Sequence, residues 1–593
     1  MSLIVVDSFE MAHQCTALLA DVPVIALDTE TTGLEWSDTA FLVSLATRWD
    51  EYVIPSGIAR MMRPLWEKPR QWRFKNALFD LHMMQKLLGF GLSGEKHDAT
   101  VYARLERNDR FGKNAYSLAG LAKREGWEKD GSVDTYIKKN KLYTERVLPL
   151  GDKYKQPRFD LVPQEIMYKY AAQDARLTYD LIDRYTERLN SRELEVAHTE
   201  ADLTTVCEMM EWHGVRVSLP YTKAAMGQEE LKLLAARQRF KELSGGVDFV
   251  ASAKCLEPLF TAAGETIHLT DEGNPSFTKD ILDTYSSPLA GAVRGIRAHE
   301  KLISTYYKNF INMATPQGEY HVIHPNMWTA GTRTRRFSYS EPNLQNLPKE
   351  EDADGSEAAV RACFVPRPGR TFVSLDYAQQ EYRLMLAYAN ERTLIKKVMD
   401  GADVHQATAD LMGISRKYAK TLNFAILYGA GPEKIAGMLG VSELDARRLK
   451  LEYFGALPKV ERFIDNVIRV GRARGYVENW RGFKLHADRE HAYALPNHLI
   501  QSGGAEAIKV GMVDSAAAGY FTKEDCLPVI QVHDQLVLDS TDAAFDRIPH
   551  IIACMENAFP EKNGMRLKVD VAWSRVSFAE YTMQKGLPDA RKL

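Results

Sequence analysis

Two acidic residues that lie far apart in the sequence could hold the metal ions of a phosphoryl-transfer site. Asp376 ends the alternating segment 370–376, whose pattern predicts a short strand. Asp534 lies between two β-rich runs in segment 529–539, as expected for a hairpin with the acid at its turn. Carboxylates at adjacent strand ends can hold two Mg2+ ions about 3.5–4 Å apart, which supports in-line displacement at phosphorus. We therefore predict that these two acids are catalytic metal ligands.

A basic and aromatic helix is expected between these two acids. Arg416, Lys420, Phe424 and Tyr428 are spaced four residues apart. They advance by about 40° each around a helix and so occupy one arc of roughly 120°. Two cations with two aromatic rings suit a nucleoside triphosphate, with its phosphates, sugar and base. Taken alone, the pattern is also compatible with an ordinary amphipathic helix.

A second set of acids lies in the first third of the chain. Asp28 and Glu30 end an apolar run that predicts a strand, and residues two apart on a strand share a face. Two such carboxylates repel each other unless a cation lies between them. Asp80 follows on a probable helix, and Tyr170 precedes Asp174 by one helical turn. Oxygen ligands suit Mg2+, although Asp-x-Glu alone could be a surface strand end with scattered acids.

The composition is that of a multidomain globular protein. A chain of 593 residues should fold into about three to five compact units. No apolar run approaches the roughly 18 residues that span a membrane, and no secretory signal is visible. The six cysteines are scattered, which argues against disulfides and structural zinc and favours a reducing cytoplasm. The net charge of −3 is mild evidence against nucleic-acid binding, but acids gathered around metals would offset basic surface.

Residues 1–190 resemble the DEDD family of 3′→5′ exonucleases, in the subgroup that has a tyrosine in the third motif. The matching residues occur in the family's order: Asp28, Glu30, Asp80, Tyr170 and Asp174. The resemblance implies an RNase H-like α/β sheet, two Mg2+ ions held by the four acids, and a tyrosine that orients the attacking water. Asp98 stands where relatives often carry an aspartate, and we expect it to be structural. No stretch before Asp28 is long enough for a separate 5′ nuclease domain, so we expect a layout without one.

Residues 191–593 resemble the family A DNA polymerases, the relatives of bacterial DNA polymerase I. Three segments correspond to motifs A, B and C: 376–383, 416–429 and 533–535. Segment 342–348, Pro-Asn-Leu-Gln-Asn-Leu-Pro, matches the family's primer-template segment. A helix over 195–213, ended by Gly214, is expected where the palm begins. The resemblance implies a right-hand architecture with these parts: palm 191–220, 321–395 and 491–593, thumb 221–320, and fingers 396–490.

The same resemblance implies roles for individual residues. Asp376, Asp534 and the backbone carbonyl of Tyr377 would hold the metal ions. Lys420 would grip the incoming phosphates with Arg416 and donate a proton to pyrophosphate. The other expected dNTP contacts are Phe424, Tyr428, Glu381, His405 and Gln379, with Glu381 excluding ribonucleotides by crowding the 2′ position. The expected DNA contacts are Arg336, Asn343, Gln345, Asn497, Gln501 and His533.

Two positions depart from the family pattern. Arg335 stands where relatives usually have glycine, and it either adds a phosphate contact or alters the local turn. Gln535 stands where relatives usually carry glutamate. Because the two-metal mechanism needs only Asp376, Asp534 and a carbonyl, a neutral amide at 535 should preserve activity while changing the local charge by one unit.

We therefore predict an α/β multidomain enzyme: a template-directed, DNA-dependent DNA polymerase with a proofreading 3′→5′ exonuclease and a replicative role. Each site would use two Mg2+ ions, which Mn2+ could replace. The expected partners are primer-template DNA and dNTPs, and the expected state is a monomer in the cytoplasm, or in the host cytoplasm if the chain is encoded by a phage. One alternative is a 3′→5′ exonuclease whose C-terminal half is a non-catalytic DNA-binding module. The other is a single-subunit RNA polymerase, against which Glu381 and the exonuclease residues both speak.

Overall fold

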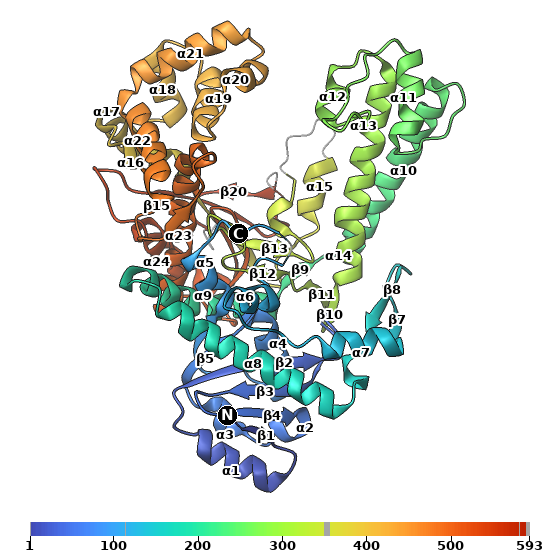
Figure 1. Ribbon diagram of the computed structural model, residues 1–593. Coiled ribbons are helices and arrows are strands. Elements are labelled where there is room, and N and C mark those ends of the chain that lie inside the picture. The colour runs from blue at the N-terminus through green and yellow to red at the C-terminus, as the bar shows by residue number, and fades with distance from the viewer. Residues whose placement is uncertain (1, 113, 349–355, 580–581, 589–593) are drawn as a thin grey trace.

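The computed structural model describes residues 2–112, 114–348, 356–579 and 582–588. Two helical arms rise on either side of a central region, and the N-terminal third of the chain lies beneath them (Figure 1). The arm drawn in green contains α10 to α13, and the arm drawn in orange contains α17 to α22. Within the described residues, no helix is both long and apolar enough to cross a membrane.

The first third of the chain is built on a six-stranded mixed sheet in the order β1-β4-β3-β2-β5-β6. Strands β2, β3 and β4 form an antiparallel meander, whereas β5 and β6 run parallel to β2. This arrangement agrees with the α/β sheet predicted for residues 1–190. The strands are β1 Leu3–Val5, β2 Val24–Thr31, β3 Ala40–Ala46, β4 Glu51–Pro55, β5 Arg70–Phe74 and β6 Gly94–Asp98.

Helices surround this sheet, and a small hairpin extends from it. The apolar faces of the helices close over buried aromatic residues such as Trp66 and Trp72. The helices are α1 Phe9–Leu19, α2 Ser56–Ala59, α3 Arg63–Glu67, α4 Ala77–Leu88, α5 Ala99–Glu106, α6 Leu118–Arg124, α7 Ser132–Asn140 and α8 Gln164–Thr186. The hairpin strands are β7 Tyr143–Val147 and β8 Lys153–Pro157.

A long helix, α9 (Ser191–His213), leads from this sheet into the rest of the chain. It starts with a capping box between Asn190 and Glu193. It ends at Gly214, whose φ of 61° favours glycine and where a Cβ atom would lie 2.5 Å from the carbonyl oxygen of Ile323. The predicted helix with its glycine stop is therefore confirmed.

The green arm carries its own apolar core, which includes Phe240 and Phe260. Its helices are α10 Leu219–Leu243, α11 Ala253–Ala262, α12 Lys279–Thr284 and α13 Pro288–Lys301, continued by a π-helical turn Leu302–Tyr307 and α14 Lys308–Met313. At its base lie β9 Val215–Val217, β10 Thr315–Gln317, β11 Tyr320–Ile323, β12 Asn326–Trp328, β13 Ser338–Ser340 and α15 Ser356–Ala362. The mainly helical character predicted for 221–320 is confirmed.

The central region is a five-stranded antiparallel sheet in the order β17-β18-β14-β19-β20. Its middle strand, β14, confirms the strand predicted over 370–376, and β17 with β18 confirms the hairpin around Asp534. The strands are β14 Thr371–Tyr377, β17 Cys526–Val532, β18 Gln535–Ser540, β19 Val569–Ser574 and β20 Gln584–Lys585. The helices of this central region are α16 Gln380–Ala389, α23 Leu495–Ala517 and α24 Ile548–Asn557.

The orange arm contains the predicted basic helix, which is confirmed as α19. Ser415 caps its first turn by accepting a hydrogen bond from the Tyr418 N–H group. The helices of this arm are α17 Arg392–Met399, α18 Val404–Met412, α19 Arg416–Leu427, α20 Pro432–Leu439, α21 Glu443–Ala456 and α22 Pro458–Arg474. The small strands β15 Tyr476–Glu478 and β16 Lys484–His486 return the chain to α23.

Candidate active sites

The first candidate site lies where α8 crosses β2. Asp28 and Glu30 share a face of β2, and α8 places Asp174 over that face. One carboxylate oxygen from each of the three lies within 4.8 Å of the others. The structure therefore brings together three of the four acids predicted for the exonuclease site.

The fourth acid, Asp80, is held differently. It lies in the first turn of α4 and accepts hydrogen bonds from the Thr29 N–H group at 2.9 Å and from the Thr29 hydroxyl at 2.6 Å. Asp80 is close enough to repel Asp28 and raise its pKa. It is not among the three acids whose carboxylate oxygens all lie within 4.8 Å of one another. Asp98 accepts from the N–H groups of Ala77 and Thr100 at the starts of α4 and α5, which is the structural role expected for it.

Burial and crowding make these acids reluctant to ionise. Burial, with repulsion from Asp174, raises the pKa of Glu30 to about 8. Burial also raises the pKa of Asp80 to about 7, against the opposing effect of its Thr29 hydrogen bonds. The pKa values of Asp28 and Asp174 are raised mainly by burial as well. Oxygen ligands with uncompensated charge are the donors that a hard divalent cation prefers.

Lys129 completes this site, and the sequence analysis missed it. Its ammonium group lies 2.6 Å from Asp174 Oδ1 and 4.0 Å from the centre of the Tyr170 ring. The loop that carries it is fixed by a hydrogen bond of 2.6 Å from the Asp130 N–H group to the Gln173 side chain on α8. No local pattern marks Lys129, because its partners come from a helix that starts far downstream. The site thus contains one cation in direct contact with its acids.

The second candidate site lies at one end of the central sheet. Asp376 on β14 pairs directly with Gln535 on β18, and the Tyr377 N–H group donates to the Asp534 carbonyl oxygen at 3.2 Å. Asp376 and Asp534 therefore occupy neighbouring ends of adjacent strands, as predicted. Asp376 is exposed and Asp534 half-buried. His533, at the turn of the hairpin, has a φ of 54° and is exposed.

A further acid lies beside Asp376. Asp570 on β19 is its direct partner on the side opposite Gln535, and direct partners in an antiparallel ladder face the same way. Asp570 is exposed, so its charge adds to this end of the sheet. No role for Asp570 was predicted from the sequence. The Gln535 amide donates to the Ser374 hydroxyl at 2.6 Å, so this departure from the family pattern is bonded within the sheet.

The predicted nucleotide-contact arc on α19 is exposed along its whole length. Arg416, Lys420, Phe424 and Tyr428 all face solvent, whereas the opposite face of the helix is buried. Arg416 pairs with Asp403 at 2.8 Å. A buried face opposite an exposed one is what an ordinary amphipathic helix has, and the feature that this pattern leaves unexplained is the pair of exposed aromatic rings, Phe424 and Tyr428.

His405 supports the middle of this arc. Its ring lies 5.6 Å from the Phe424 ring, and its Nδ1 lies 2.9 Å from the Asn423 amide nitrogen. Burial lowers the pKa of His405, and Asp403 opposes that shift. Gln379 lies close by and donates to Asp403 at 3.5 Å.

Glu381 links α16 to the end of α19. It accepts from the Tyr428 hydroxyl at 3.1 Å and forms an ion pair with Arg336. Burial, followed by the Glu381 charge, raises the pKa of Tyr428 to about 12, so this phenol is neutral at ordinary pH. Glu381 is thereby fixed beside the strand end that carries Asp376.

Comparisons with known proteins agree with this geometry. Residues 221–578 match the family model described as DNA polymerase family A. The chain belongs to this family. Residues 3–190 match the family model described as 3′-5′ exonuclease. The predicted recognition and the α/β fold class, an exonuclease domain followed by a polymerase domain, are confirmed. Domains of both families generally use divalent metal ions.

Similar proteins come from bacteria and from phages. DNA polymerase I of Chloroflexus aurantiacus is 28% identical over 576 residues, which cover 88% of this chain and 58% of that protein. The DNA polymerase of Mycobacterium phage L5 is 26% identical, with 87% of each chain covered. The thermostable DNA polymerase I of Thermus filiformis is 28% identical over 81% of this chain and 59% of its own length. The chain thus spans little more than half of these two bacterial relatives but most of the phage protein.

A solved structure has the same fold. The POL domain of Pol1 from M. smegmatis, in complex with DNA primer-template and dNTP, aligns with a TM-score of 0.79 at 20% identity. The alignment covers 98% of this chain and 99% of that chain. The assignment of the green arm to the thumb and of the orange arm to the fingers, with the residue boundaries of palm, thumb and fingers, stays a prediction.

The residues expected to contact DNA lie around the central sheet. Asn343 accepts from the Gln345 N–H group at 3.0 Å, and the Gln345 amide donates to Gln531 on β17 at 3.2 Å. Asn497 on α23 donates to the Leu427 carbonyl oxygen at the end of α19, at 3.1 Å. Gln501, one turn further along α23, is half-buried. Gln345 is thus anchored to the strand that leads to Asp534, and Asn497 to the end of α19. The DNA contacts of all these residues stay predictions.

Arg335 does not have the first of the two roles considered for it. It is buried, which excludes the phosphate contact, and it pairs with Glu200 on α9 and with Glu506 on α23 at 3.1 Å. Its φ of 62° is the left-handed conformation that glycine favours. Lys509 also pairs with Glu200, at 2.5 Å. Two buried cations and two buried carboxylates thus meet where α9, α23 and the loop between β12 and β13 join.

Proposed function

We propose that this family A chain is a template-directed DNA polymerase with a proofreading 3′→5′ exonuclease. The observation that carries the proposal is the position of Asp376 and Asp534 at neighbouring strand ends within the matched polymerase segment. The separate acid group on β2 and α8 within the matched exonuclease segment supports the second activity. We further propose a replicative role, a monomeric state and a cytoplasmic location.

The donors at both sites suit Mg2+, with Mn2+ as a substitute. All of them are carboxylate or carbonyl oxygens: Asp376, Asp534 and the carbonyl of Tyr377 for the polymerase, and Asp28, Glu30, Asp80 and Asp174 for the exonuclease. When bound, such ions activate the attacking oxygen and neutralise charge on the leaving group. The ions would stabilise the ionised form of the exonuclease acids, which burial and mutual repulsion otherwise disfavour.

In the polymerase reaction, the primer 3′-hydroxyl would attack the α-phosphate of a dNTP. Arg416 and Lys420 would bind the triphosphate, and Lys420 would protonate pyrophosphate. Arg416 is paired with Asp403, so the phosphates would have to replace that carboxylate as its partner. Phe424 would pack on the sugar and Tyr428 on the nascent base pair, both from the exposed arc of α19.

Glu381 would select deoxyribose. Its carboxylate is fixed by Arg336 and by the Tyr428 hydroxyl, so it could not swing away from a ribose 2′-hydroxyl without losing both partners. A buried or half-buried charge pair that is broken on one side costs about 3–5 kcal/mol at most. This supports a DNA product rather than an RNA product.

In the exonuclease reaction, water would attack the terminal phosphodiester. The pKa of Tyr170 is raised, mainly by burial, so its hydroxyl is neutral and can orient water by hydrogen bonding but cannot act as a base. Lys129 contacts Asp174 and would have to yield that carboxylate when metal ions enter. A frayed, mispaired primer end would be the substrate.

Primer extension tests the whole proposal. The wild-type protein should extend a matched primer, and should trim a mismatched primer before extending it. Asp28→Ala/Glu30→Ala should extend the matched primer without trimming the mismatched one, and Asp376→Ala should degrade primers without extending them. Extension that survives Asp376→Ala would favour an exonuclease with a non-catalytic C-terminal half. Equal incorporation of rNTPs and dNTPs would favour a single-subunit RNA polymerase.

A further inference from the structure

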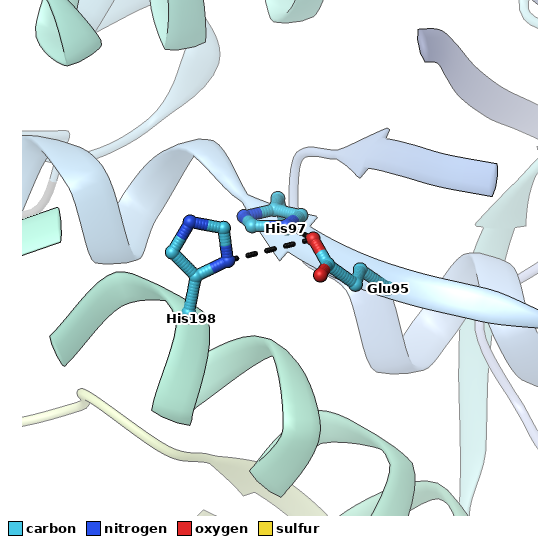
Figure 2. A group of neighbouring side chains, drawn as sticks. All are labelled: Glu95, His97 and His198. Carbon is cyan, nitrogen blue, oxygen red and sulfur yellow. Dashed lines mark hydrogen bonds and ion pairs between the residues drawn. The ribbon is translucent and has the colours of Figure 1, made fainter. Parts of the chain in front are cut away.

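Glu95, His97 and His198 form a cluster outside both candidate active sites (Figure 2). Glu95 and His97 lie two apart on β6, so they share one face of that strand. His198 projects toward them from α9, the helix between the exonuclease and polymerase segments matched above. One ligand atom from each residue lies within 4.8 Å of the others. The cluster thus joins the exonuclease segment to the helix that connects it with the polymerase segment.

One of the two separations around Glu95 matches the distance between neighbouring ligands of a bound zinc ion, and the other is shorter. Glu95 Oε2 lies 2.8 Å from His97 Nε2 and 3.5 Å from His198 Nδ1. In a tetrahedral zinc site, with metal–ligand distances of about 2.0–2.2 Å, neighbouring ligand atoms lie about 3.3–3.6 Å apart. Glu95 and His198 are exposed, so small rotations of these side chains could change the separations that differ from this range.

His97 is oriented before any ligand arrives. Its side chain is buried, and its Nδ1 lies 2.8 Å from the Tyr102 hydroxyl, which directs Nε2 toward Glu95. Metal-binding histidines commonly have a hydrogen-bond partner of this kind on the second ring nitrogen.

Gln71 helps to hold the Glu95 carboxylate at this place. Arg73 donates to the Gln71 side-chain oxygen at 3.3 Å, which turns the Gln71 amide nitrogen toward His97 Nε2, also at 3.3 Å. The Gln71 side chain also forms a hydrogen bond with Glu95. Gln71 and His97 thus both orient the carboxylate that faces His198.

We propose that Glu95, His97 and His198 bind one divalent transition-metal ion of the zinc class, with a further position left for water. Two imidazoles and one carboxylate favour Zn2+ or Co2+ over Mg2+, which prefers oxygen ligands. The site differs in this respect from both acidic sites described above. It clamps β6 to α9 next to the buried Lys96–Glu208 ion pair, at 3.0 Å, which joins the same two elements. Binding therefore stabilises the contact between the exonuclease segment and α9.

The test uses the full-length protein, stripped with chelator and kept in excess Mg2+ so that the oxygen sites are occupied. Zn2+ is then added, unbound metal is removed by gel filtration, and zinc is counted per chain. The wild-type protein should retain about one Zn2+ and melt at a higher temperature than without it. His198→Ala and Glu95→Gln should each weaken Zn2+ binding by about tenfold or more and abolish the melting shift.

A matched control is available in His491. It lies 2.7 Å from Asp488 in an exposed histidine–acid pair that belongs to no three-residue metal group among the described residues. His491→Ala should retain zinc like the wild-type protein. Each variant is compared with its own melting temperature in Mg2+ alone, so a general loss of stability is not mistaken for lost binding. Co2+ should give visible absorption bands of a four-coordinate site only when His198 and Glu95 are intact.

Two results would overturn the proposal. One is a wild-type protein that retains no zinc and shows no melting shift. The other is zinc retention that is the same in His198→Ala and in the wild-type protein.

Discussion

Glu30 and Glu200 are both buried glutamates, yet their pKa values move in opposite directions. Burial, with repulsion from Asp174, raises the pKa of Glu30 to about 8. Burial also opposes the ionisation of Glu200, but Lys509 and Arg335 outweigh it and lower the pKa to about 2. The difference therefore comes from the neighbours and not from the depth of burial.

The balance of charge separates the two regions. Around Glu200, two carboxylates meet two permanent cations, so the network is complete without a metal ion. Around Glu30, three carboxylates crowd within 4.8 Å and only Lys129 contacts one of them directly among the described residues. Matched buried acids hold structure together, whereas unmatched ones mark a place for divalent ions. The predictions below test this distinction.

The largest expected effect comes from changing Glu30, in the acid group that lacks matching cations. Glu30→Gln keeps the shape of the side chain but removes a metal ligand, so we expect exonuclease activity to fall by about 1,000-fold. Primer extension should stay close to the wild-type rate, because the polymerase acids lie on another sheet. Release of nucleotides from a single-stranded 3′ end measures the first activity. Exonuclease activity that survives this change would remove Glu30 from the site.

Glu200→Gln should lower the stability of the protein and leave its exonuclease activity unchanged. It leaves two buried cations, Arg335 and Lys509, with one buried carboxylate, Glu506, so we expect the free energy of unfolding to fall by about 3–5 kcal/mol. Chemical denaturation measures this, with Glu195→Gln, an exposed change on the same helix, as the control. At low temperature both variants should keep their exonuclease activity. A stable Glu200→Gln protein would show that the network contributes little.

The pH dependence of stability should differ in sign between the two regions. Glu30 keeps its proton in the folded state up to about pH 8, whereas its ordinary pKa is 4.5. Its contribution to stability is therefore complete below about pH 4.5 and is lost as the pH rises toward 8. The contribution of Glu200 is present above its ordinary pKa of 4.5 and is lost as the pH falls toward 2.

Calorimetry in chelator should accordingly show a melting temperature that declines as the pH rises from 5 to 8, a window set by the pKa of Glu30. Added Mg2+ should reverse the decline, and by more at the higher pH, because the ionised acids bind it. Glu30→Gln should flatten the decline. A melting temperature that rises over this pH range in chelator and does not change on adding Mg2+ would contradict the account of Glu30 as an acid without a matching cation.

Lys129→Met should change the metal requirement of one site only. Lys129 competes with metal ions for Asp174, so its removal should lower the Mg2+ concentration for half-maximal exonuclease activity several-fold. The Mg2+ requirement of primer extension should not move. Lys129→Arg keeps the charge and serves as the control. An unchanged requirement in Lys129→Met would mean that the lysine and the ions do not share Asp174.

The smallest effect is expected from Gln535→Glu. The new charge would lie beside Asp376 at an exposed strand end, where charge interactions are worth about 1 kcal/mol or less. Primer extension should therefore stay within about fivefold of wild type. Its Mg2+ requirement should decrease slightly, measured alongside the unchanged exonuclease. A large loss of activity would show that the bond from Gln535 to Ser374 matters more than the charge.

The sequence predicted most of the elements that carry chemistry, because their signals are local. The alternation before Asp376 and the two β-rich runs around Asp534 each specify a strand from neighbouring residues. The four-residue spacing on α19 and the glycine at 214 define a helix face and a helix end in the same way. Local patterns of this kind do not depend on how the domains pack.

What the sequence could not supply depends on distant partners. Arg335 and Glu200 are separated by 135 residues, and nothing near either one indicates an ion pair. Lys129 reaches Asp174 across 45 residues from an irregular loop. Asp570 gains its place beside Asp376 only through the register of β14 and β19. In the sequence these residues look like ordinary charged residues, because their partners are brought close only by the fold.

Anomalous diffraction from crystals soaked in Mn2+ tests the central claim most directly. We expect Mn2+ between Asp28, Glu30 and Asp174, with Lys129 displaced from Asp174, and Mn2+ beside Asp376 and Asp534. We expect none at the Glu200 cluster. Acid groups that stay without Mn2+ while Lys129 keeps its contact, or Mn2+ bound next to Glu200, would contradict the account.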